Sequence, residues 1–403
     1  MNSVIVTDVR YRMSLAIIRS LGKKGIPVTA VEYDTTPYKS ALGFFSRYTR
    51  KKEFLPGAPY ENTAFINKII NLASVSTDSQ FVKPVLIPVG LDSLTAVSKH
   101  KDVLEPYLSF IVPSPESIEI ANDTGKLLEI AACKGIPCPE TTTLYENETI
   151  EELAARLAYP VVIKYREGEI LKFKPEKRYS IVKSPDRFIK VFEEMHSIQS
   201  CPIVQKYING SGYGVSVVFD KNSDPLEIFC HKRLREYPVT GGPSCLCESI
   251  WNDRLVSYAV TLLKALKWQG VAMVEFKGDP EGDIRLMEIN PRFWGSLPLS
   301  VAAKCDIPYA YYRASMGEKA ETRLYEWHPS RYKLGKKMRF LFQDIMSLPG
   351  YLKLSSNKLR FLASFVLQLL NPRISDGVLE LRDWRPSFYY VMQLLRKGKR
   401  KKQ

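Results

Sequence analysis

The sequence predicts a chain of mixed architecture, α/β in its first part and α+β in its second, followed by a basic helical region. Short apolar runs alternate with helical patterns through residue 112, which is typical of a parallel sheet covered by helices. Strands and one hairpin then dominate, and the last 85 residues combine helical spacing with many Lys and Arg. We therefore expect domains at 1–112 and 113–318 and a mainly helical C-terminal extension at 319–403.

The first domain repeats a strand–helix–strand unit. Strand patterns occur in VIVTDV at 4–9, PVTAVEYD at 27–34 and KPVLIPVG at 83–90, and the helical pattern at 14–25 ends on a glycine. Repetition of this unit predicts a parallel sheet with helices on its faces. The first turn, TDVRYRMS, lacks the glycine-rich fingerprint of a dinucleotide site, so no such site is expected there.

The second domain begins after Pro113 and Pro115 and loses the regular βαβ order. Two of its helical patterns end at Gly135 and Gly270, as helices commonly do. Its last two strands are joined by GDPEGD, a turn-forming sequence, so 271–291 is expected to be a hairpin. The predicted helices of this domain are 124–135, 151–158 and 251–270, and its predicted strands before the hairpin are 159–165, 201–208, 213–220 and 226–234.

The net charge of +15 is concentrated in the C-terminal extension, which holds 19 Lys and Arg against 6 Asp and Glu. A nucleic-acid-binding protein is expected to carry its basic residues on the folded body, so nucleic acid is not expected as a partner. The stretch FLASFVLQLL, flanked by Lys358, Arg360 and Arg373, has the pattern of a helix that lies on an anionic membrane surface. A helix packed against the protein, or a tail that binds nucleic acid, is the alternative reading.

The sequence predicts a cytoplasmic protein, with contact to the inner face of the membrane as the one peripheral role expected. The N-terminus, MNSVIVTDVRYR, lacks the layout of a signal peptide, and no apolar run reaches the roughly 20 residues that cross a bilayer. The 7 cysteines form no CxxC pair, which indicates reduced thiols rather than a zinc site or a disulfide framework.

The predicted hairpin places two carboxylates together. If its strands pair across an even-numbered loop, Glu275, Glu288 and Asn290 share one face, with the two carboxylates about 5–8 Å apart. Two carboxylates and an amide oxygen are hard ligands that suit Mg²⁺ or Mn²⁺ bridging phosphates, and Arg292 on the same face could reach a phosphate. A surface hairpin whose acids face water is the alternative, but apolar neighbours such as Met273 disfavour it.

These residues resemble a known family. EFK followed by LMEINPRFWGSL is similar to the metal-binding end of the ATP-grasp ligases, of the type found in carbamoyl-phosphate synthase and biotin carboxylase. The helix NDTGKLLEIAACKGIPCPET and the strands YPVVIKY and CPIVQKYI resemble earlier parts of that domain. The N-terminal βαβ pattern resembles the domain that precedes it, so the resemblance covers about residues 1–315 and implies a two-lobed ATP-grasp domain.

The resemblance also implies roles for individual residues. Two departures stand out: Thr124 replaces a lysine found in many members, and the loop YREGEILKFKPEKRYS has one glycine and several lysines where a glycine-rich phosphate loop is usual. The resemblance implies that ATP contacts Lys126, Lys164, Gln205, Lys206, Tyr207 and Ile208, that Mg²⁺ or Mn²⁺ binds Glu275, Glu288 and Asn290, and that Lys164, Arg235 and Arg292 stabilise the transferring phosphoryl group.

The activity implied by the resemblance is ATP-dependent joining of a small-molecule carboxylate to an amine through an acyl phosphate. Phosphoryl transfer of this kind needs charge neutralisation and alignment rather than a protein nucleophile. Bicarbonate activation by the same site, or nucleotide binding without ligase activity, are the alternatives. The stretch HKRLREYPVTGGPSCLCES is expected to select one of the substrates.

Overall fold

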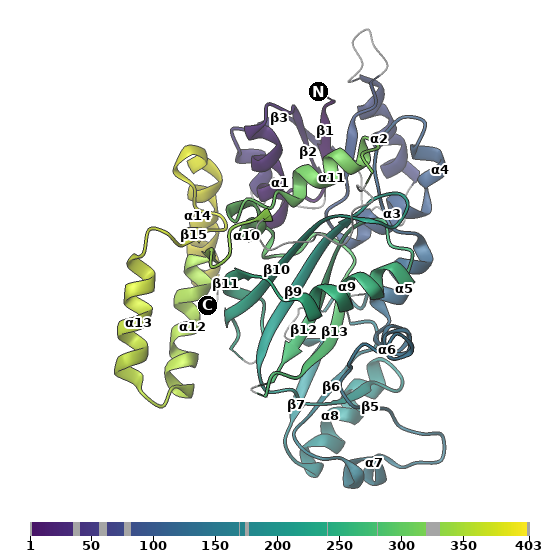
Figure 1. Cartoon of the computed structure of the whole chain (residues 1–403), viewed down its shortest axis with the longest axis vertical. Coiled ribbons are helices and arrows are strands. Elements are labelled where there is room, and N and C mark those ends of the chain that lie inside the picture. The colour runs from purple at the N-terminus through teal and green to yellow at the C-terminus, as the bar shows by residue number, and fades with distance from the viewer. Residues whose placement is uncertain are drawn as a thin grey trace.

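The computed structural model arranges the chain in four parts (Figure 1). The N-terminal α/β unit lies at the top, a large twisted sheet in the middle, a small sheet-and-helix lobe at the bottom, and the C-terminal helices along the left side. The fold class expected from the sequence, α/β followed by α+β, is confirmed. The described residues are 2–34, 41–55, 63–75, 82–168, 170–173, 177–239, 241–279, 281–319 and 331–400.

The N-terminal unit is a parallel sheet between helices. Its elements are β1 (Val4–Val6), α1 (Arg12–Lys23), β2 (Val28–Tyr33), η2 (Leu42–Phe45), β3 (Thr49–Leu55), α2 (Thr63–Val75), β4 (Val85–Ile87), α3 (Leu91–Lys99) and α4 (Lys101–Leu104). The four strands pair in the order β3-β2-β1-β4, all parallel, as the alternating pattern predicts. β3 has no strand signature in the sequence because TRKKEFL is largely charged, which suits the partly exposed edge of a sheet.

The small lobe follows two connecting helices. Its elements, with those helices, are α5 (Pro115–Asn122), α6 (Thr124–Cys133), β5 (Thr141–Thr142), α7 (Ile150–Arg156), β6 (Val161–Lys164), β7 (Tyr179–Val182), α8 (Pro185–Ile198) and β8 (Ile203–Lys206). The strands form an antiparallel sheet in the order β5-β8-β6-β7. Helices α7 and α8 pack on this sheet around Leu153, Ile163, Phe188 and Phe192, which are all fully buried.

A seven-stranded sheet forms the centre of the molecule. Its strands are β9 (Ser211–Phe219), β10 (Pro225–Glu236), β11 (Ser244–Ile250), β12 (Gly270–Gly278), β13 (Ile284–Asn290), β14 (Lys337–Arg339) and β15 (Ser375–Asp376). The helices that pack on it are α9 (Asp253–Ala265), α10 (Leu297–Ala302) and α11 (Ile307–Ser315). The strand order is β13-β12-β9-β10-β11-β14-β15. Helix α9 buries its apolar stripe against one face of this sheet, while α10, α11 and the N-terminal unit cover residues of the other face, such as Val271 and Met273.

The C-terminal region completes the sheet and touches the N-terminal unit. Its helical elements are α12 (Leu341–Leu354), α13 (Lys358–Leu370), η7 (Leu381–Asp383) and α14 (Trp384–Arg400). β14 pairs with β11, and β15 pairs with β14. Arg19 of α1 donates its Nε–H to Asp383 at 2.9 Å. The expected helices are present, but the expectation of a separate extension from residue 319 differs from a structure in which two strands of this region belong to the central sheet.

Candidate active site

The β12–β13 hairpin presents two carboxylates from directly opposite positions. Glu275 pairs with Glu288, and Met273 with Asn290, in antiparallel register. Near the turn the register is different, because Phe276 pairs with Leu286 and Met287 is an extra residue in β13. This β-bulge brings Glu275, Glu288 and Asn290 to one face, although the loop that joins the strands is not the even-numbered one assumed from the sequence.

The three side chains contact one another and a buried arginine. Asn290 Nδ2 donates to Glu275 Oε1 at 3.0 Å and lies 3.4 Å from Glu288 Oε1. Arg233 of β10 makes an ion pair with the other oxygen of Glu275 and a longer one, at 3.5 Å, with Glu236. Burial raises the pKa of Glu275, Arg233 opposes that shift, and the carboxylate of Glu288 adds to it. Burial beside Glu288 therefore makes Glu275 hold its proton more strongly than a free carboxyl group does, in spite of the neighbouring guanidinium.

A cleft of about 400 Å³ opens between the small lobe and the central sheet, and the three side chains line it. Lys164, at the end of β6, lines the same cleft from the small lobe. Burial lowers the pKa of Lys164 to about 8, and the carboxylate of Glu288 opposes that shift. The cleft thus brings an ammonium group from one lobe to carboxylates from the other, as the sequence predicts for a phosphate-binding lysine.

Residues Gln205 to Ile208, at and just beyond the end of the inner strand β8, line another wall of the cleft. The side-chain amide of Gln205 donates to Thr141 Oγ1 at 3.0 Å, and Lys206 Nζ lies 3.0 Å from Glu140 Oε1. The main-chain N–H groups of Lys206 and Tyr207 are also engaged, because they donate to the carbonyls of Glu140 at 3.0 Å and Pro160 at 3.2 Å. A ligand at this wall would therefore meet groups that the protein already holds in place.

Two predicted residues do not reach the cleft. Arg235 donates Nε and Nη2 to the carboxylate of Asp344, at 2.6 and 2.8 Å, and Nη1 to Gln368 at 2.8 Å. Lys126 lies on the surface and bonds to Glu119 at 2.6 Å. Neither lines the cleft, so the structure does not bring Arg235 or Lys126 together with the other residues of the predicted site.

A register shift in β10 explains why Arg235 points away from the cleft. Arg233 pairs with Cys247, but Arg235 pairs with Leu246, so an extra residue lies between the two arginines. A β-bulge turns the following side chain to the opposite face of the sheet. Arg233 therefore points to the cleft and Arg235 points to α12 and α13, although simple alternation would place both on one side.

Further arginines line the cleft. Arg292, after β13, lines it as expected and donates Nη1 to the carbonyl of Phe293 at 2.9 Å. Arg166 and Arg178, within the lysine-rich loop, also line it, whereas residues 169 and 174–176 of that loop lie outside the described residues. Arg12, at the start of α1, lines it from the N-terminal unit. Nothing in the local sequence around Arg12 points to this position, because the contact is made across domains.

The donor set fits a divalent cation. No group of three His, Cys, Asp or Glu side chains with metal-binding geometry is present within the described parts of the chain. The hairpin offers instead two opposed carboxylates and an amide that touches both, open to the cleft. Hard oxygen donors in small number, with room left for phosphate oxygens and water, suit Mg²⁺.

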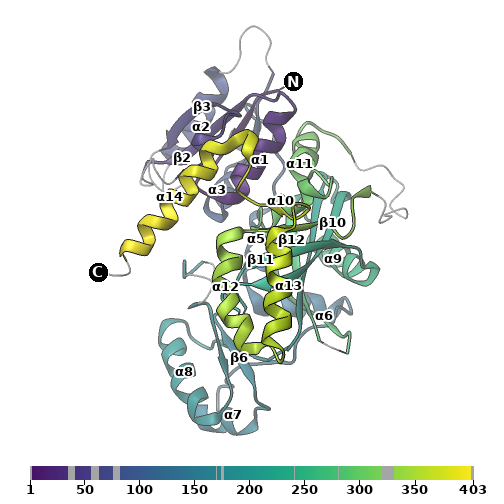
Figure 2. The same cartoon turned by 90° about the vertical axis from the view of Figure 1, so that its left-hand side faces the viewer.

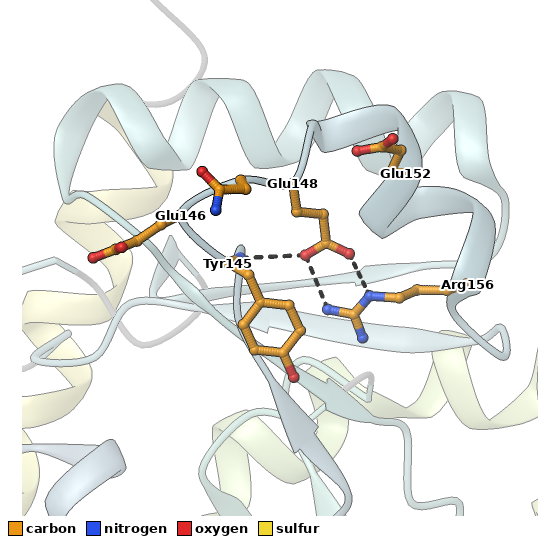
Figure 3. Close-up of a pocket in the computed structure, with 6 residues that line it drawn as sticks. Tyr145, Glu146, Glu148, Glu152 and Arg156 are labelled. Atoms are coloured by element: carbon orange, nitrogen blue, oxygen red, sulfur yellow. Dashed lines mark hydrogen bonds and ion pairs between the residues drawn. The ribbon is translucent and has the colours of Figure 1, made fainter.

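A second depression lies on the outer side of the small lobe, between the loop before α7 and α7 itself (Figure 3). Arg156 pairs there with Glu148, which also accepts a hydrogen bond from the main-chain N–H of Tyr145 at 3.2 Å. Its charged groups thus satisfy one another, and we assign it no ligand. It is lined by Tyr145, Glu146, Asn147, Glu148, Glu152 and Arg156.

Comparison with known proteins agrees with this arrangement. Residues 201–337 match the family described as "ATP-grasp in the biosynthetic pathway with Ter operon". The chain is 23% identical over 332 residues to a biotin carboxylase from Nostoc sp.. The aligned region covers 77% of this chain and 70% of that protein. The chain spans 60% of biotin carboxylase 2 of Populus trichocarpa, with 24% identity over 77% of this chain.

Solved structures show the same fold at low sequence identity. A biotin carboxylase from Campylobacter jejuni in complex with β,γ-ATP has a TM-score of 0.64 at 18% identity, over 84% of this chain and 74% of that one. An L-amino acid ligase from Bacillus licheniformis has a TM-score of 0.53 at 15% identity, over 78% of this chain and 74% of that one. N5-carboxyaminoimidazole synthase from Aspergillus clavatus has a TM-score of 0.58 at 18% identity, over 83% of this chain and 80% of that one.

Proposed function

We propose that the chain is an ATP-dependent ligase of the ATP-grasp type that activates a substrate carboxylate and joins it to an amine, since residues 201–337 match an ATP-grasp family. The observation that carries this proposal is the Glu275, Glu288 and Asn290 cluster, which faces a cleft shared with Lys164 of the other lobe. This is the arrangement that a nucleotide triphosphate with a divalent cation requires. The solved L-amino acid ligase and N5-carboxyaminoimidazole synthase support the same reaction class.

The reaction needs no protein nucleophile. A carboxylate oxygen of the substrate bonds to the γ-phosphorus of ATP while the bond from that phosphorus to ADP breaks. The amine nitrogen then bonds to the acyl carbon, inorganic phosphate leaves with the electron pair of the C–O bond, and the amine loses a proton. Both steps depend on alignment and on neutralising phosphate charge.

The residues of the cleft supply that charge and alignment. Glu275, Glu288 and Asn290 would hold Mg²⁺, which when bound neutralises the phosphate oxygens. Lys164, with a pKa of about 8, is mostly protonated at neutral pH and brings a positive charge from the small lobe. Arg292 adds a fixed donor fork from the end of the hairpin, and the main chain of 206–208 would hold the base.

The test is release of ADP by the full-length protein with Mg²⁺-ATP and a library of carboxylate and amine pairs. Glu288→Gln removes one negative oxygen donor without changing shape, so ADP release should fall at least about 100-fold while the melting temperature is kept. Glu281→Gln is the matched control, because Glu281 lies exposed in the turn of the same hairpin. Normal ADP release by Glu288→Gln would contradict the assignment of the metal site.

Bicarbonate activation is the second candidate, because biotin carboxylases are among the similar proteins. The same cluster could form carboxyphosphate if bicarbonate were the first substrate. Incorporation of isotopically labelled bicarbonate into product, in the same assay, distinguishes this from amide formation. A protein that binds ATP without releasing ADP with any pair would instead be a nucleotide-binding protein.

We propose further that the protein is cytoplasmic and that its C-terminal helices contact an anionic membrane surface. Within the described parts of the chain, no helix has the length and apolarity to cross a membrane. Helix α13 nevertheless leaves Leu359, Leu367 and Leu370 more than 70% exposed, next to Lys358 and Arg360. Exposed leucines beside lysines and arginines suit the interface of an anionic bilayer better than water alone.

A further inference from the structure

The cleft has a cationic corner that ATP and Mg²⁺ do not explain. Arg12, the first residue of α1, lines the cleft together with Trp294 and Phe340, which come from the end of the hairpin and the start of α12. Arg12 and Phe340 contact each other from opposite ends of the chain, and Trp294 lines the same cleft. Its groups are donors rather than acceptors: a guanidinium and an indole N–H.

Both donors lack partners. Arg12 Nη1 and Trp294 Nε1 are buried, and neither has a hydrogen-bond partner among the described residues. Trp294 is only 2% exposed, so solvent does not reach its ring freely. A buried donor without an acceptor costs about 1–3 kcal/mol, and more when it is charged, so such atoms are usually matched by a ligand.

The carboxylates of the cleft could form an ion pair with Arg12 only if they left their present partners. Of the acids that line the cleft, Glu275 and Glu236 pair with Arg233. Glu288 contacts Asn290 within the cluster assigned to the metal. The positive charge of Arg12 is thus left for a group that enters the cleft.

Contacts with an aromatic ring and with the preceding loop hold Arg12 in place. Its guanidinium carbon lies 3.9 Å from the centre of the Phe340 ring, and Phe340 is 2% exposed. The preceding loop is held at Asp8, whose carbonyl accepts from Ser14 Oγ at 2.8 Å and from the main chain of Tyr11 at 3.0 Å. A guanidinium stacked on an aromatic ring keeps the N–H groups of its edge available for a planar oxyanion.

We infer that this corner binds an oxyanion, a carboxylate or a phosphate, that one of the two substrates carries in addition to its reacting group. This inference rests on the proposed ligase function and narrows its substrate class. The substrate is an amino acid, a dicarboxylate or a phosphorylated compound rather than a simple monoacid or alkylamine. Arg12 would supply a two-pronged contact to this oxyanion, and a neutral group in its place would leave the buried guanidinium without a partner; Trp294 Nε1 is a further unpartnered donor in the lining of the same cleft.

The experiment uses matched compounds that differ only in the extra charge. The pairs are glycine and glycinamide as amines, succinate and succinamate as acids, and O-phosphoserine and serine for the phosphate case. ADP release by the full-length protein is measured for each with Mg²⁺-ATP and the library of partner substrates. The variants are Arg12→Gln, Arg12→Lys and, as control, Arg187→Gln, an exposed arginine in the first turn of α8.

For at least one pair, the charged member should have a kcat/KM at least about 10-fold above that of the neutral member. Arg12→Gln should bring that ratio close to one, Arg12→Lys should retain part of it, and Arg187→Gln should not change it. Which pair responds identifies the source of the oxyanion. Equal use of charged and neutral members by the unmodified protein, or an unchanged ratio in Arg12→Gln, would overturn the inference while leaving the ligase proposal intact.

Failure of the ligase proposal itself gives a different result. If no pair supports ADP release, binding of the same six compounds is measured by saturation-transfer NMR in the presence of a non-hydrolysable ATP analogue. Preferential binding of a charged member that is lost in Arg12→Gln supports the oxyanion corner without ligase activity. Equal binding of both members, or no binding of any, overturns it.

Discussion

At the scale of single residues, the pair of Arg235 and Asp344 shows how this chain uses buried charge. Both side chains are almost fully buried, and they join β10 to α12 through two hydrogen bonds. Phe365 of α13 lies against the same guanidinium at 4.7 Å. The pair therefore anchors the C-terminal helices to the central sheet and takes no part in the cleft.

We predict that Asp344→Ala lowers the free energy of unfolding by about 3–5 kcal/mol, because it leaves Arg235 buried without its anion. Urea denaturation followed by circular dichroism measures this. The double variant Arg235→Met with Asp344→Leu should recover most of the loss, since it removes both charges. An Asp344→Ala protein as stable as the original would show that water replaces the lost carboxylate.

Cysteine reactivity offers a second prediction at this scale. Burial raises the pKa of Cys230, Cys245 and Cys247 to about 12, so at pH 8 the reactive thiolate is much rarer than for a free thiol. Iodoacetamide at pH 8 should modify exposed Cys133 in the native protein and reach these three only after unfolding. Peptide mass spectrometry over time measures each site, and rapid native labelling of Cys247 would contradict the buried placement.

The sequence predicts the carboxylate cluster but not every cation around it. Glu275, Glu288 and Asn290 are recognisable because alternation along a strand places them on one face. The choice between Arg233 and Arg235 depends on a bulge, which one extra residue creates and which no composition signal marks. Arg12 depends on contact between domains, so local patterns cannot place it.

At the scale of elements, two short strands decide how the C-terminal region attaches. β14 is three residues long and β15 two, and β14 consists of Lys-Met-Arg. Runs of two or three residues are too short to show the apolar–polar alternation of a strand. The sequence therefore predicts only helices in this region. Met338 at the centre of β14 is 1% exposed, so this short strand carries a buried contact against β11.

We predict that a chain ending at residue 336 does not fold stably. It would uncover the edge of β11 and leave Arg235 without Asp344. Soluble yield and the cooperativity of thermal unfolding measure this, with a chain ending at residue 395 as the control. A chain ending at 336 that melts like the full-length protein would mean that the small lobe and the rest of the central sheet are stable without the C-terminal region.

At the scale of the whole molecule, the C-terminal helices lie on one side of the protein. Figure 2 shows α12, α13 and α14 together on the side that faces the viewer. Helix α14 leaves Trp384, Phe388 and Leu395 about 60% exposed, spaced so that they share a helix face. This side is the surface proposed to meet a membrane.

We predict that the protein sediments with vesicles that contain phosphatidylglycerol and not with pure phosphatidylcholine vesicles, and that salt weakens the binding. Leu367→Glu with Leu370→Glu should lower the bound fraction about 10-fold, because both side chains are exposed on α13 and would bring charge into the interface. Val103→Glu, at an exposed apolar position of α4, is the control. Binding that is unaffected by the α13 changes but competes with DNA would point to a nucleic-acid surface.

The meeting of Arg12 and Phe340 across the cleft has a practical consequence. The N-terminal unit and the C-terminal region place Arg12 and Phe340 in the lining of the cleft, and the stretch from 113 to 318 supplies the rest of that lining. A fragment trimmed to that middle stretch would keep Glu275, Glu288 and Asn290 but would lose both Arg12 and the ring on which it stacks. Swapping the flanks between relatives should therefore change which compound is accepted, whereas swapping the middle should change how fast it reacts.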